Sequence, residues 1–544
     1  MPEPQWFETC PGQPEFENRT LIAMKKLVYV SLLVFASQQM IAQLPEDAIR
    51  MSWNVPSGTA RQQAIGGAMG SLGGEITSLF VNPAGLGFYK TGDFVITPGI
   101  TFLNGKSNFR GTPSTSESGT RFNLGTTGFV WGQYNPRSKW ANKTFSIGVN
   151  RMANFNGRVH YQGENNFSSF SESFAEEFAA SGVPIDAVLY TAPLSLGTKL
   201  ANYTYLIDTL SVDGDIEVVG LPERNAILAG ANAQLFQEKD IRTKGGITEI
   251  AFGYAANMSD KFYLGGSIGV PIVNYERTTE FRETDVSGDN DNNFNSATYT
   301  EYYRSQGVGI NARLGMIVKP TNSFRAGFSI HTPTIFGMSE RTTGTMESDL
   351  ENYLSDGQPA VANEDTIYTQ FGADVPEYRY DYYSPWRFLV SGSWMFSAVE
   401  DVTKQRGFIT ADIEYVTHQS SRFHSADYDE DDEYYKGVNE GVKIAYKNAF
   451  NFRVGGEMKF NTLMTRLGFA YYGSPYDDDA LKAHKMNVSG GIGYRNSGIF
   501  LDLTYVYGLN KDVDFPYRLA DKANTFADIR NHNSNLLVTF GVKF

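Results

Sequence analysis

Residues 58–90 read GTARQQAIGGAMGSLGGEITSLFVNPAGLGFYK. The segment is rich in Gly and Ala and almost uncharged, which favours close backbone approach in a narrow space over an ordinary packed helix. Asn82-Pro83 predicts a turn, because proline fixes its own φ and drives the preceding residue towards extended geometry. An ordinary glycine-rich loop before the first strand is the alternative interpretation. The chain that follows decides between the two.

The composition indicates a membrane β-barrel rather than a string of soluble domains. The 544 residues include 54 Gly, 31 Tyr and 38 Phe, and only 19% are charged. A membrane barrel needs one lipid-facing and one water-facing side on each strand, with aromatic girdles at the rims. The mean hydropathy of -0.32 fits this class, because alternation hides the apolar face from an average. The formal net charge of -14 argues against nucleic acid as a partner.

The N-terminal region predicts export. Residues 24–42 form a signal peptide with two lysines and a short apolar core, and we expect cleavage after Ala42. Residues 1–23 precede this signal and are interpreted as an upstream extension or artefact. The apolar core is too short to cross a bilayer, and no later stretch reaches the ~20 apolar residues of a spanning helix. Because Cys10 lies in the extension, the mature chain has no disulfide framework.

Alternating segments of about ten residues follow from Asp93 onwards, the length that a tilted membrane strand requires. In 450–460, Phe450 and Phe452 share one face while Arg453 and Glu457 lie on the other. A soluble sandwich also alternates, but it seldom places charges on the inner face of many strands. The predicted strands are 93–103, 121–132, 143–152, 246–258, 261–274, 306–318, 323–332, 385–396, 407–417, 448–460, 462–472, 485–495, 498–507 and 535–544.

These segments predict an all-β fold: a transmembrane antiparallel β-barrel of about fourteen strands with an N-terminal hatch, or plug, in its lumen. Short turns alternate with long loops, as periplasmic turns and outer loops do in bacterial barrels. A lumen of this width is either an open channel or plugged. We therefore expect residues 43–92 to form the hatch and residues 93–544 the barrel.

The hatch segment resembles the N-terminal hatch of the FadL-type outer-membrane transporters, a family that takes up long-chain fatty acids and, in one branch, aromatic hydrocarbons. The resemblance rests on Gly66, Gly67 and Gly70, on Phe80, and on the motif Asn82, Pro83 and Ala84. Fourteen strands and the terminal Phe544 are also similar to the family. The acidic residue that usually precedes the motif is shifted here to Glu75, and the long loops have no counterpart.

The resemblance implies diffusion of a hydrophobic ligand without an energy source. The outer loops would capture the ligand, which would pass into a pocket above the hatch and leave sideways through the barrel wall. Asn82, Pro83 and Ala84 would shape the hatch rather than touch the ligand. A break in the strand pattern near residues 154–157 is a candidate kink for the lateral opening.

The loop 153–245 carries a candidate capture surface. Phe170, Phe174 and Phe178 recur at i, i+4 and i+8, so they share one face of a predicted helix. Exposed apolar patches usually bind something. The alternative is that the three rings pack against the neighbouring segment 189–200, since aromatic stripes are more often core than ligand site.

The sequence predicts two kinds of role for charged residues. Arg313, Arg453, Glu457, Arg466 and Arg495 are predicted to line the lumen and anchor the hatch. Direct pairing of an arginine with a ligand carboxylate is the alternative. The acidic clusters at 427–433 and around Asp285, Asp289 and Asp291 could hold Ca²⁺, but neither has a full calcium loop, and solvated outer loops are the favoured interpretation.

The sequence predicts a transporter, not an enzyme, with no cofactor and no metal site. No G-x-S-x-G, P-loop or HExxH motif occurs, and the six histidines are scattered. The predicted function is passive uptake of hydrophobic small molecules, long-chain fatty acids first, from an outer-membrane location. The alternative is an envelope interaction module, a secretion-accessory barrel of the same family with envelope proteins as partners.

Overall fold

The computed structural model describes residues 45–544 except for 117, 191–193, 213–214, 231, 352, 355–358, 370–373, 397–405 and 427–432. The predicted extension, the signal peptide and Cys10 lie outside the described residues. No helix among the described residues is long and apolar enough to cross a membrane.

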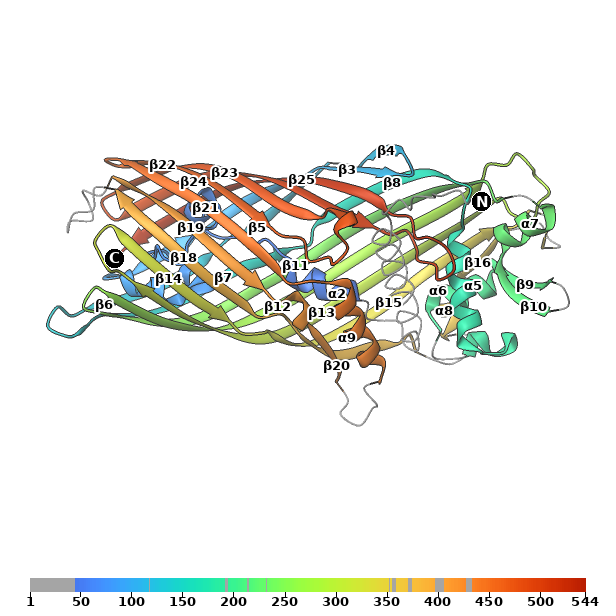
Figure 1. Ribbon diagram of the computed structural model, residues 1–544, viewed down its shortest axis with the longest axis horizontal. Helices are drawn as coiled ribbons and strands as arrows, with labels where there is room; N and C mark the ends of the chain where they lie inside the picture. Colours follow the sequence, from blue (N-terminus) through green and yellow to red (C-terminus); the bar gives the residue numbers. More distant parts are fainter. Residues whose placement is uncertain are drawn as a thin grey trace, which may run out of the picture.

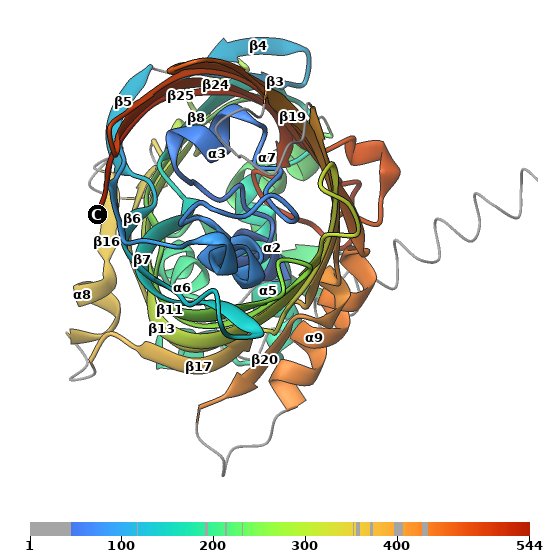
Figure 2. The same cartoon turned by 90° about the vertical axis from the view of Figure 1, so that its left-hand side faces the viewer.

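One antiparallel sheet closes on itself to form a barrel of fourteen membrane-crossing strands (Figures 1 and 2). The first and last strands pair directly, with Asp93 opposite Lys543. The Gly92 and Phe544 backbones exchange two hydrogen bonds at the same rim. The predicted fold class is thus confirmed, and no strand edge is left open at the seam.

Several crossing strands are built from two or three consecutive segments because short breaks interrupt them. The strands along the chain are β1 (Asp93–Ile96), β2 (Pro98–Leu103), β3 (Gly105–Phe109), β4 (Thr112–Thr115), β5 (Gly119–Leu124), β6 (Thr127–Tyr134), β7 (Trp140–Asn154), β8 (Gly157–Asn165), β11 (Leu235–Met258), β12 (Phe262–Asp285), β13 (Ser296–Val318), β14 (Phe324–His331), β15 (Ile335–Asp349), β16 (Ala360–Asn363), β17 (Glu377–Tyr383), β18 (Arg387–Phe396), β19 (Gly407–Val416), β20 (Arg422–Ser425), β21 (Ala449–Phe460), β22 (Leu463–Tyr472), β23 (His484–Asn496), β24 (Ile499–Asp514) and β25 (Ala527–Lys543).

The predicted faces of the strands are correct. Phe450, Phe452 and Val454 are 52, 46 and 43% exposed, whereas Arg453 and Glu457 between and beyond them are buried. The predicted short turns also occur, and they use residues with positive φ, among them Ser259, Asp260, Asn461 and Gly498. Alternation therefore identified which side of each strand faces lipid.

The strands on one side of the barrel run much farther outward than the sequence predicted. β12 ends at Asp285 rather than 274, and β13 begins at Ser296 rather than 306. β15, at Ile335–Asp349, lies inside a predicted loop. Above the membrane the outward face no longer needs apolar residues, so the ladder continues without the alternation that marks a strand in lipid. On β12 the exposed apolar residues stop at Ile272, and the outer half of the strand stands outside the bilayer.

The N-terminal segment lies inside the barrel (Figure 2). Its elements are α2 (Pro45–Ser52), α3 (Ala60–Ala64), α4 (Ser78–Val81) and the 3₁₀ helix η1 (Pro83–Phe88). Thr59 caps α3 and Asn82 caps η1 through their side-chain oxygens. We call residues 53–92 the hatch. The helix α2 lies beyond it and packs in the middle of the lumen against Phe336, Tyr380 and Tyr382.

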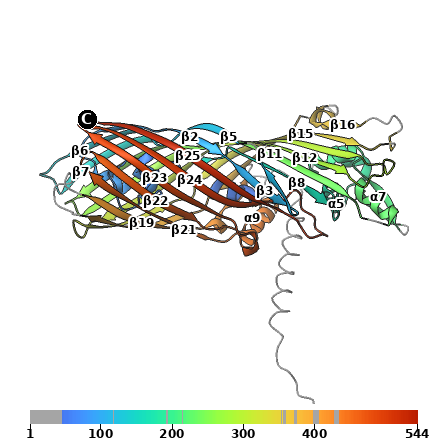
Figure 3. The same cartoon turned by 90° about the horizontal axis from the view of Figure 1, so that it is seen from above.

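A helical cap occupies the end of the barrel opposite the C-terminus (Figures 1 and 3). Ser169 and Glu172 form a capping box at the start of α5, and Gly182 ends it in the left-handed conformation. The elements here are α5 (Phe170–Ser181), η2 (Ile185–Tyr190), α6 (Leu196–Tyr203), β9 (Ile207–Val212), β10 (Asp215–Gly220), α7 (Leu221–Ala229) and α8 (Glu364–Ile367), while η5 (His418–Ser420), α9 (Glu433–Ala445) and η6 (Asp479–Leu481) belong to other outer loops.

Candidate functional site

The Asn82-Pro83-Ala84 motif fixes the hatch to the barrel wall. The Asn82 side-chain nitrogen donates to the Gly70 carbonyl at 2.6 Å and lies 3.3 Å from the carbonyl oxygens of Met316 and Phe328, on β13 and β14. Its oxygen accepts the Ala84 N–H at 3.2 Å. One amide thus joins two parts of the hatch to two neighbouring strands. Phe80 is 3% exposed and packs with the hatch residues Ile76, Leu79 and Leu86.

The wall meets the hatch through glycines, so that backbone touches backbone. A Cβ on Gly468 of β22 would lie 2.0 Å from the Gly66 nitrogen. A Cβ on Gly455 of β21 would lie 2.3 Å from the Ile65 oxygen. Across the lumen, a Cβ on Gly265 would lie 2.5 Å from the Pro83 oxygen. These contacts leave no room for side chains at the three positions, so the hatch backbone lies directly against the wall there.

The predicted lumen charges divide into two groups. Glu457 lies 3.2 Å from Arg61 of the hatch and 2.6 Å from Arg466, so it ties the hatch to the wall. Three of the others pair within the wall: Arg313 binds both oxygens of Glu249, Arg453 lies 2.9 Å from Glu414, and Arg466 lies 2.6 Å from Asp502. Three of the predicted arginines are therefore engaged by wall carboxylates.

Arg495 differs from the other predicted arginines. Its guanidinium lies 5.2 Å from the centre of the Phe500 ring, and its Nε has no hydrogen-bond partner. No ion pair involves it among the described residues. Arg495 lines a small space at the periplasmic end of the hatch, together with Arg61 and Glu75.

Several contacts that anchor the N-terminal segment to the wall could not be predicted from the sequence. Asp412 of β19 accepts the N–H groups of Met69 and Gly70, at 3.1 and 3.2 Å. Arg387 donates to the Ser52 carbonyl at 2.8 Å, and Lys485 to the Trp53 carbonyl at 2.7 Å. The sequence shows only that each of these residues faces inward on a predicted strand. It does not identify their partners, which lie hundreds of residues away.

The barrel wall is interrupted at the predicted kink. β7 ends at Asn154 and β8 begins at Gly157. β6 pairs with β7 only as far as Thr127 opposite Val149. Beyond that point β5 pairs with β2, and residues 150–154 of β7 pair with β11, so the facing edges of β5 and β7 share no ladder. We call this gap the breach.

The breach is bounded above and below. Farther out, the Ser107 hydroxyl donates to the His160 carbonyl, and His160 N–H donates to Ser116 Oγ at 3.0 Å. At the base, the hatch takes the place of a strand: Ser57 N–H donates to the Arg151 carbonyl at 2.8 Å, and Asn150 donates to the Ser57 carbonyl at 2.9 Å. The interrupted stretch of the ladder is therefore bounded by hydrogen bonds on both sides.

A cavity lies behind the breach. Hatch residues 54–57 and Gln63 line its inner side, and Leu103, Asn123 and the 154–158 turn line the breach. β23, β24 and β25 form the opposite wall. The space therefore links the outer side of the hatch to the gap between the strands.

The three predicted capture residues lie inside the cap. Phe170 and Phe178 are 3 and 4% exposed, and they share a core with Leu196, Leu200 and the inner faces of the long strands. Phe174 is partly buried against the same core and contacts Tyr299 edge-on at 5.9 Å. The rings thus pack against the neighbouring segment, as the alternative interpretation stated, and they form no open surface in this conformation.

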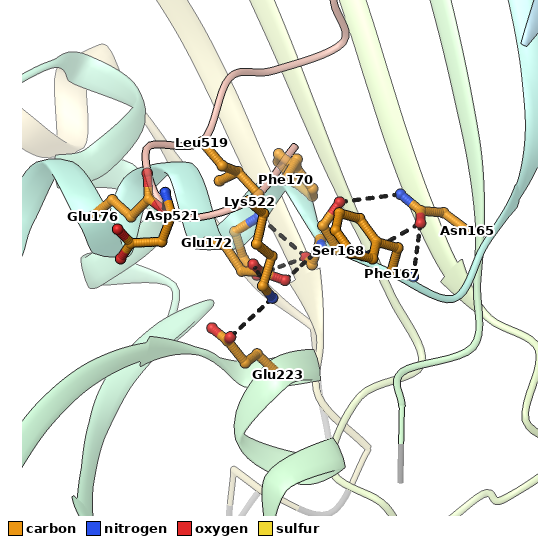
Figure 4. Close-up of polar contacts among 12 residues, drawn as sticks. Asn165, Phe167, Ser168, Phe170, Glu172, Glu176, Glu223, Leu519, Asp521 and Lys522 are labelled. Carbon is orange, nitrogen blue, oxygen red and sulfur yellow. Dashed lines mark hydrogen bonds and ion pairs between the residues drawn. The ribbon is translucent and has the colours of Figure 1, made fainter. Parts of the chain in front are cut away.

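A loop between β24 and β25 holds the cap helix α5 (Figure 4). Lys522 lies 2.6 Å from Glu172 and 3.1 Å from Glu223 of α7. Glu176 accepts the Ala520 N–H at 2.8 Å. The start of α5 is held by Glu283, at the outer tip of β12, which accepts from the Ser169 hydroxyl and the Phe170 N–H. Burial raises the pKa of Glu283 to about 7, because its effect is larger than that of these hydrogen bonds, which lower the pKa.

The acidic cluster around Asp285 is internally hydrogen-bonded. Asp285 accepts from the Ser287 hydroxyl and the Asn292 amide, both at 2.7 Å. Asp289 accepts the Asp291 N–H at 3.1 Å. In the described part of the chain, no group of three or more His, Cys, Asp or Glu could hold a metal ion. Of the other cluster, residues 427–432 lie outside the described residues.

Comparisons with known proteins agree with this architecture. No family model and no curated protein sequence matches the chain. A crystal structure of a Pseudomonas aeruginosa FadL homologue is similar with a TM-score of 0.51 and 13% identity, covering 91% of this chain and 100% of that one. A deltaS2 mutant of the monoaromatic hydrocarbon channel TodX is similar with a TM-score of 0.51 and 13% identity, covering 89% and 98%. The Pseudomonas putida toluene transporter TodX follows at 0.49 and 14%, covering 90% and 99%.

The closed ladder, the apolar lipid-facing band and the internal hatch together locate the protein in the bacterial outer membrane. The chain has the fold of the FadL-type outer-membrane transporters.

Proposed function

We propose that the protein is a passive transporter that admits hydrophobic compounds through the outer membrane, with long-chain fatty acids as the favoured substrates. The observation that carries the proposal is the combination of a hatch seated closely against the wall with an interrupted strand ladder at the breach. The glycine contacts at Gly468 and Gly455 seat the hatch directly against the wall, and we infer that the seated hatch closes the axial route. The breach and its cavity offer the alternative exit, sideways towards the bilayer.

Transport of this kind needs neither a cofactor nor a catalytic group, and no enzymatic step is part of the proposal. Burial of an acyl chain contributes about 0.8 kcal/mol per CH₂. A chain of sixteen carbons therefore gains on the order of 10 kcal/mol on leaving water, which suffices for capture from dilute solution. Release into the bilayer conserves this gain, because the chain stays in an apolar medium.

The cap is the proposed capture site. Its Phe170, Phe174 and Phe178 face an apolar core that becomes accessible only when α5 moves away from the long strands. Exchange of all three for serine should lower ligand uptake if that core receives the ligand. Phe174 is the sharpest single target, since it is only partly buried and its loss perturbs the cap least.

Lateral exit through the breach can be tested by placing a bulky side chain there. Asn123 of β5 lines the cavity, while the adjacent Phe122 is 72% exposed on the outer face. In a strain lacking the gene, Asn123→Trp should restore uptake of labelled oleate poorly, whereas Phe122→Trp should restore it to the parental rate. Equal rescue by both variants would refute lateral exit. The transport function itself would be refuted if the deletion strain took up oleate and comparable hydrophobic compounds at the parental rate.

A second candidate function is an envelope interaction module, and one observation favours it. The outer surface of the cap exposes apolar side chains: Ile216 is 76%, Leu228 64% and Ile227 48% exposed. Exposed apolar groups at the far tip of a barrel suit a protein contact. Recovery of stoichiometric envelope partners with wild type, and their loss with Leu228→Ser, would support this reading over transport.

A further inference from the structure

A short motif near the C-terminus places amides in the cavity behind the breach. Residues 531–535 read NHNSN, and all lie on β25. Asn531, Asn533 and Asn535 line the cavity. The alternate residues face away: the His532 ring stacks with Tyr507, and Ser534 accepts the Tyr505 hydroxyl at 2.9 Å. The strand period of two therefore turns three asparagines to the same side.

Neighbouring strands extend this amide surface. Asn510 of β24 pairs with Asn531 in the ladder, and Gly508 lies between Asn487 of β23 and Asn533. Asn123 faces them from β5 through a chain of hydrogen bonds: it donates to Thr101 Oγ1, which donates to Asn535. We call Asn123, Asn487, Asn510, Asn531, Asn533 and Asn535 the amide surface.

Most of these amides have unused hydrogen-bonding capacity. The side-chain oxygens of Asn123 and Asn510 are buried without a hydrogen-bond partner. Among the described residues, no side-chain hydrogen bond involves Asn487, Asn531 or Asn533. Asn487, Asn531 and Asn533 are only partly buried and line the cavity, so together with the two buried oxygens they offer donors and acceptors to a ligand or water within it.

The charged groups that line the cavity around the amide surface are hydrogen-bonded, and Arg151 among them donates to the Thr248 hydroxyl and the Gly245 carbonyl. Lys485 donates to the Trp53 carbonyl and lies 4.0 Å from the centre of the Trp53 ring. Arg158 pairs with Asp240 at 2.9 Å. Asp512 accepts from the Tyr476 hydroxyl at 3.1 Å. The groups left free to bind a ligand here are neutral amides, which both donate and accept.

We propose that the amide surface binds the polar part of an amphiphile whose head group is uncharged and rich in hydroxyl groups. This inference rests on the proposed lateral passage and specifies its substrate class. A bare hydrocarbon would displace water from the amides and leave them unpaired. A hydroxyl-bearing head group matches them, since hydroxyls and amides each supply donors and acceptors. The acyl chain would lie towards the breach, where Leu103 and Phe155 supply apolar contacts.

Binding to the full-length protein in lipid nanodiscs tests the inference by calorimetry. The probes are hexyl glucoside, hexanoate, toluene and free glucose, each below any micellar concentration. We expect hexyl glucoside to bind more tightly than the other three. The double variant Asn531→Leu/Asn533→Leu should lose about 10- to 100-fold in affinity for hexyl glucoside, as expected for two lost hydrogen bonds. It should bind toluene at least as tightly as wild type, because fewer amides are left unpaired. His532→Leu, between the two positions on the outward face, is the matched control.

Three outcomes would overturn the inference: tighter binding of hexanoate, equal binding of free glucose, or no difference between the double variant and His532→Leu. Failure of the broader transport function has a different signature. In that case the deletion strain takes up labelled oleate at the parental rate, whatever the head-group preference in nanodiscs.

Discussion

The contact of Gly468 with the hatch predicts that one added methyl group unseats the plug. In Gly468→Ala the new Cβ would lie 2.0 Å from the Gly66 nitrogen and 2.3 Å from the Ile65 carbonyl carbon, both backbone atoms. Overpacking of this kind costs about 1–3 kcal/mol. The shift also strains two hydrogen bonds through Ser489, from the Gly66 N–H and to the Ala64 carbonyl. At about 1 kcal/mol each, they bring the total to about 3–5 kcal/mol.

A penalty of this size changes the ratio of unseated to seated hatch by about two to three and a half powers of ten. Conductance in planar bilayers measures the effect directly: wild type should be nearly silent, and Gly468→Ala should pass small ions. Gly490→Ala is the matched control, because Gly490 lies opposite Leu467 on the next strand and its Cβ would meet nothing nearer than 3.5 Å. If Gly468→Ala conducts no more than Gly490→Ala, and its amide exchange over residues 58–72 is unchanged, the reasoning about the hatch seat is wrong.

Three further predictions follow from buried charge and from the cap. Arg313→Met leaves Glu249 buried and unpaired and should cost about 3–5 kcal/mol, seen as a lower unfolding temperature on heat-modifiability gels, while Glu249→Leu in the same chain should restore most of it. Because burial raises the pKa of Glu283 to about 7, cap docking is most stable below the unfolded value of 4.5 and loses up to about 3 kcal/mol as pH rises through 7. Exchange of α5 amides, corrected for intrinsic rates, should rise over that range in wild type and rise less in Glu283→Gln, in which Glu172, Glu176 and Glu177, whose pKa values burial also raises, remain. Lys522→Ala frees the loop from Glu172, so protease should cut at 515–526 faster than in wild type; an unchanged rate would show that the ion pair does not hold the loop.

Periodicity predicted the lipid-facing half of the barrel because the bilayer imposes it. Leu314 must face lipid and Arg313 must avoid it, and this requirement is local enough to appear in the sequence. The interruption at 154–157 was visible for the same reason. The long outer strand β15 was not, since residues 335–349 stand mostly in water, where no alternation is required.

The candidate site was predictable only in part. Asn82 could be singled out through its family motif, yet its hydrogen bonds to Met316 and Phe328 span more than two hundred residues and leave no trace in local sequence. Phe170 looked like an exposed stripe because its partners, such as Phe281 at 4.9 Å, lie on strand tips assigned to loops. The asparagines of NHNSN alternate plainly, but their meaning depends on which strands face them across the lumen.

The seam between β1 and β25 has a consequence for assembly. It joins Asp93 to Lys543, so the cylinder can close only after the final residues have been synthesised and exported. The hatch contacts strands from both halves of the chain, among them β13, β14, β21 and β22. Closing a loop of about 450 residues costs entropy that grows slowly with length, and a core that already holds distant strands together lowers that cost. The N-terminal segment can thus serve as an internal scaffold around which the strands assemble. Shortening it should slow folding of the barrel before it alters transport.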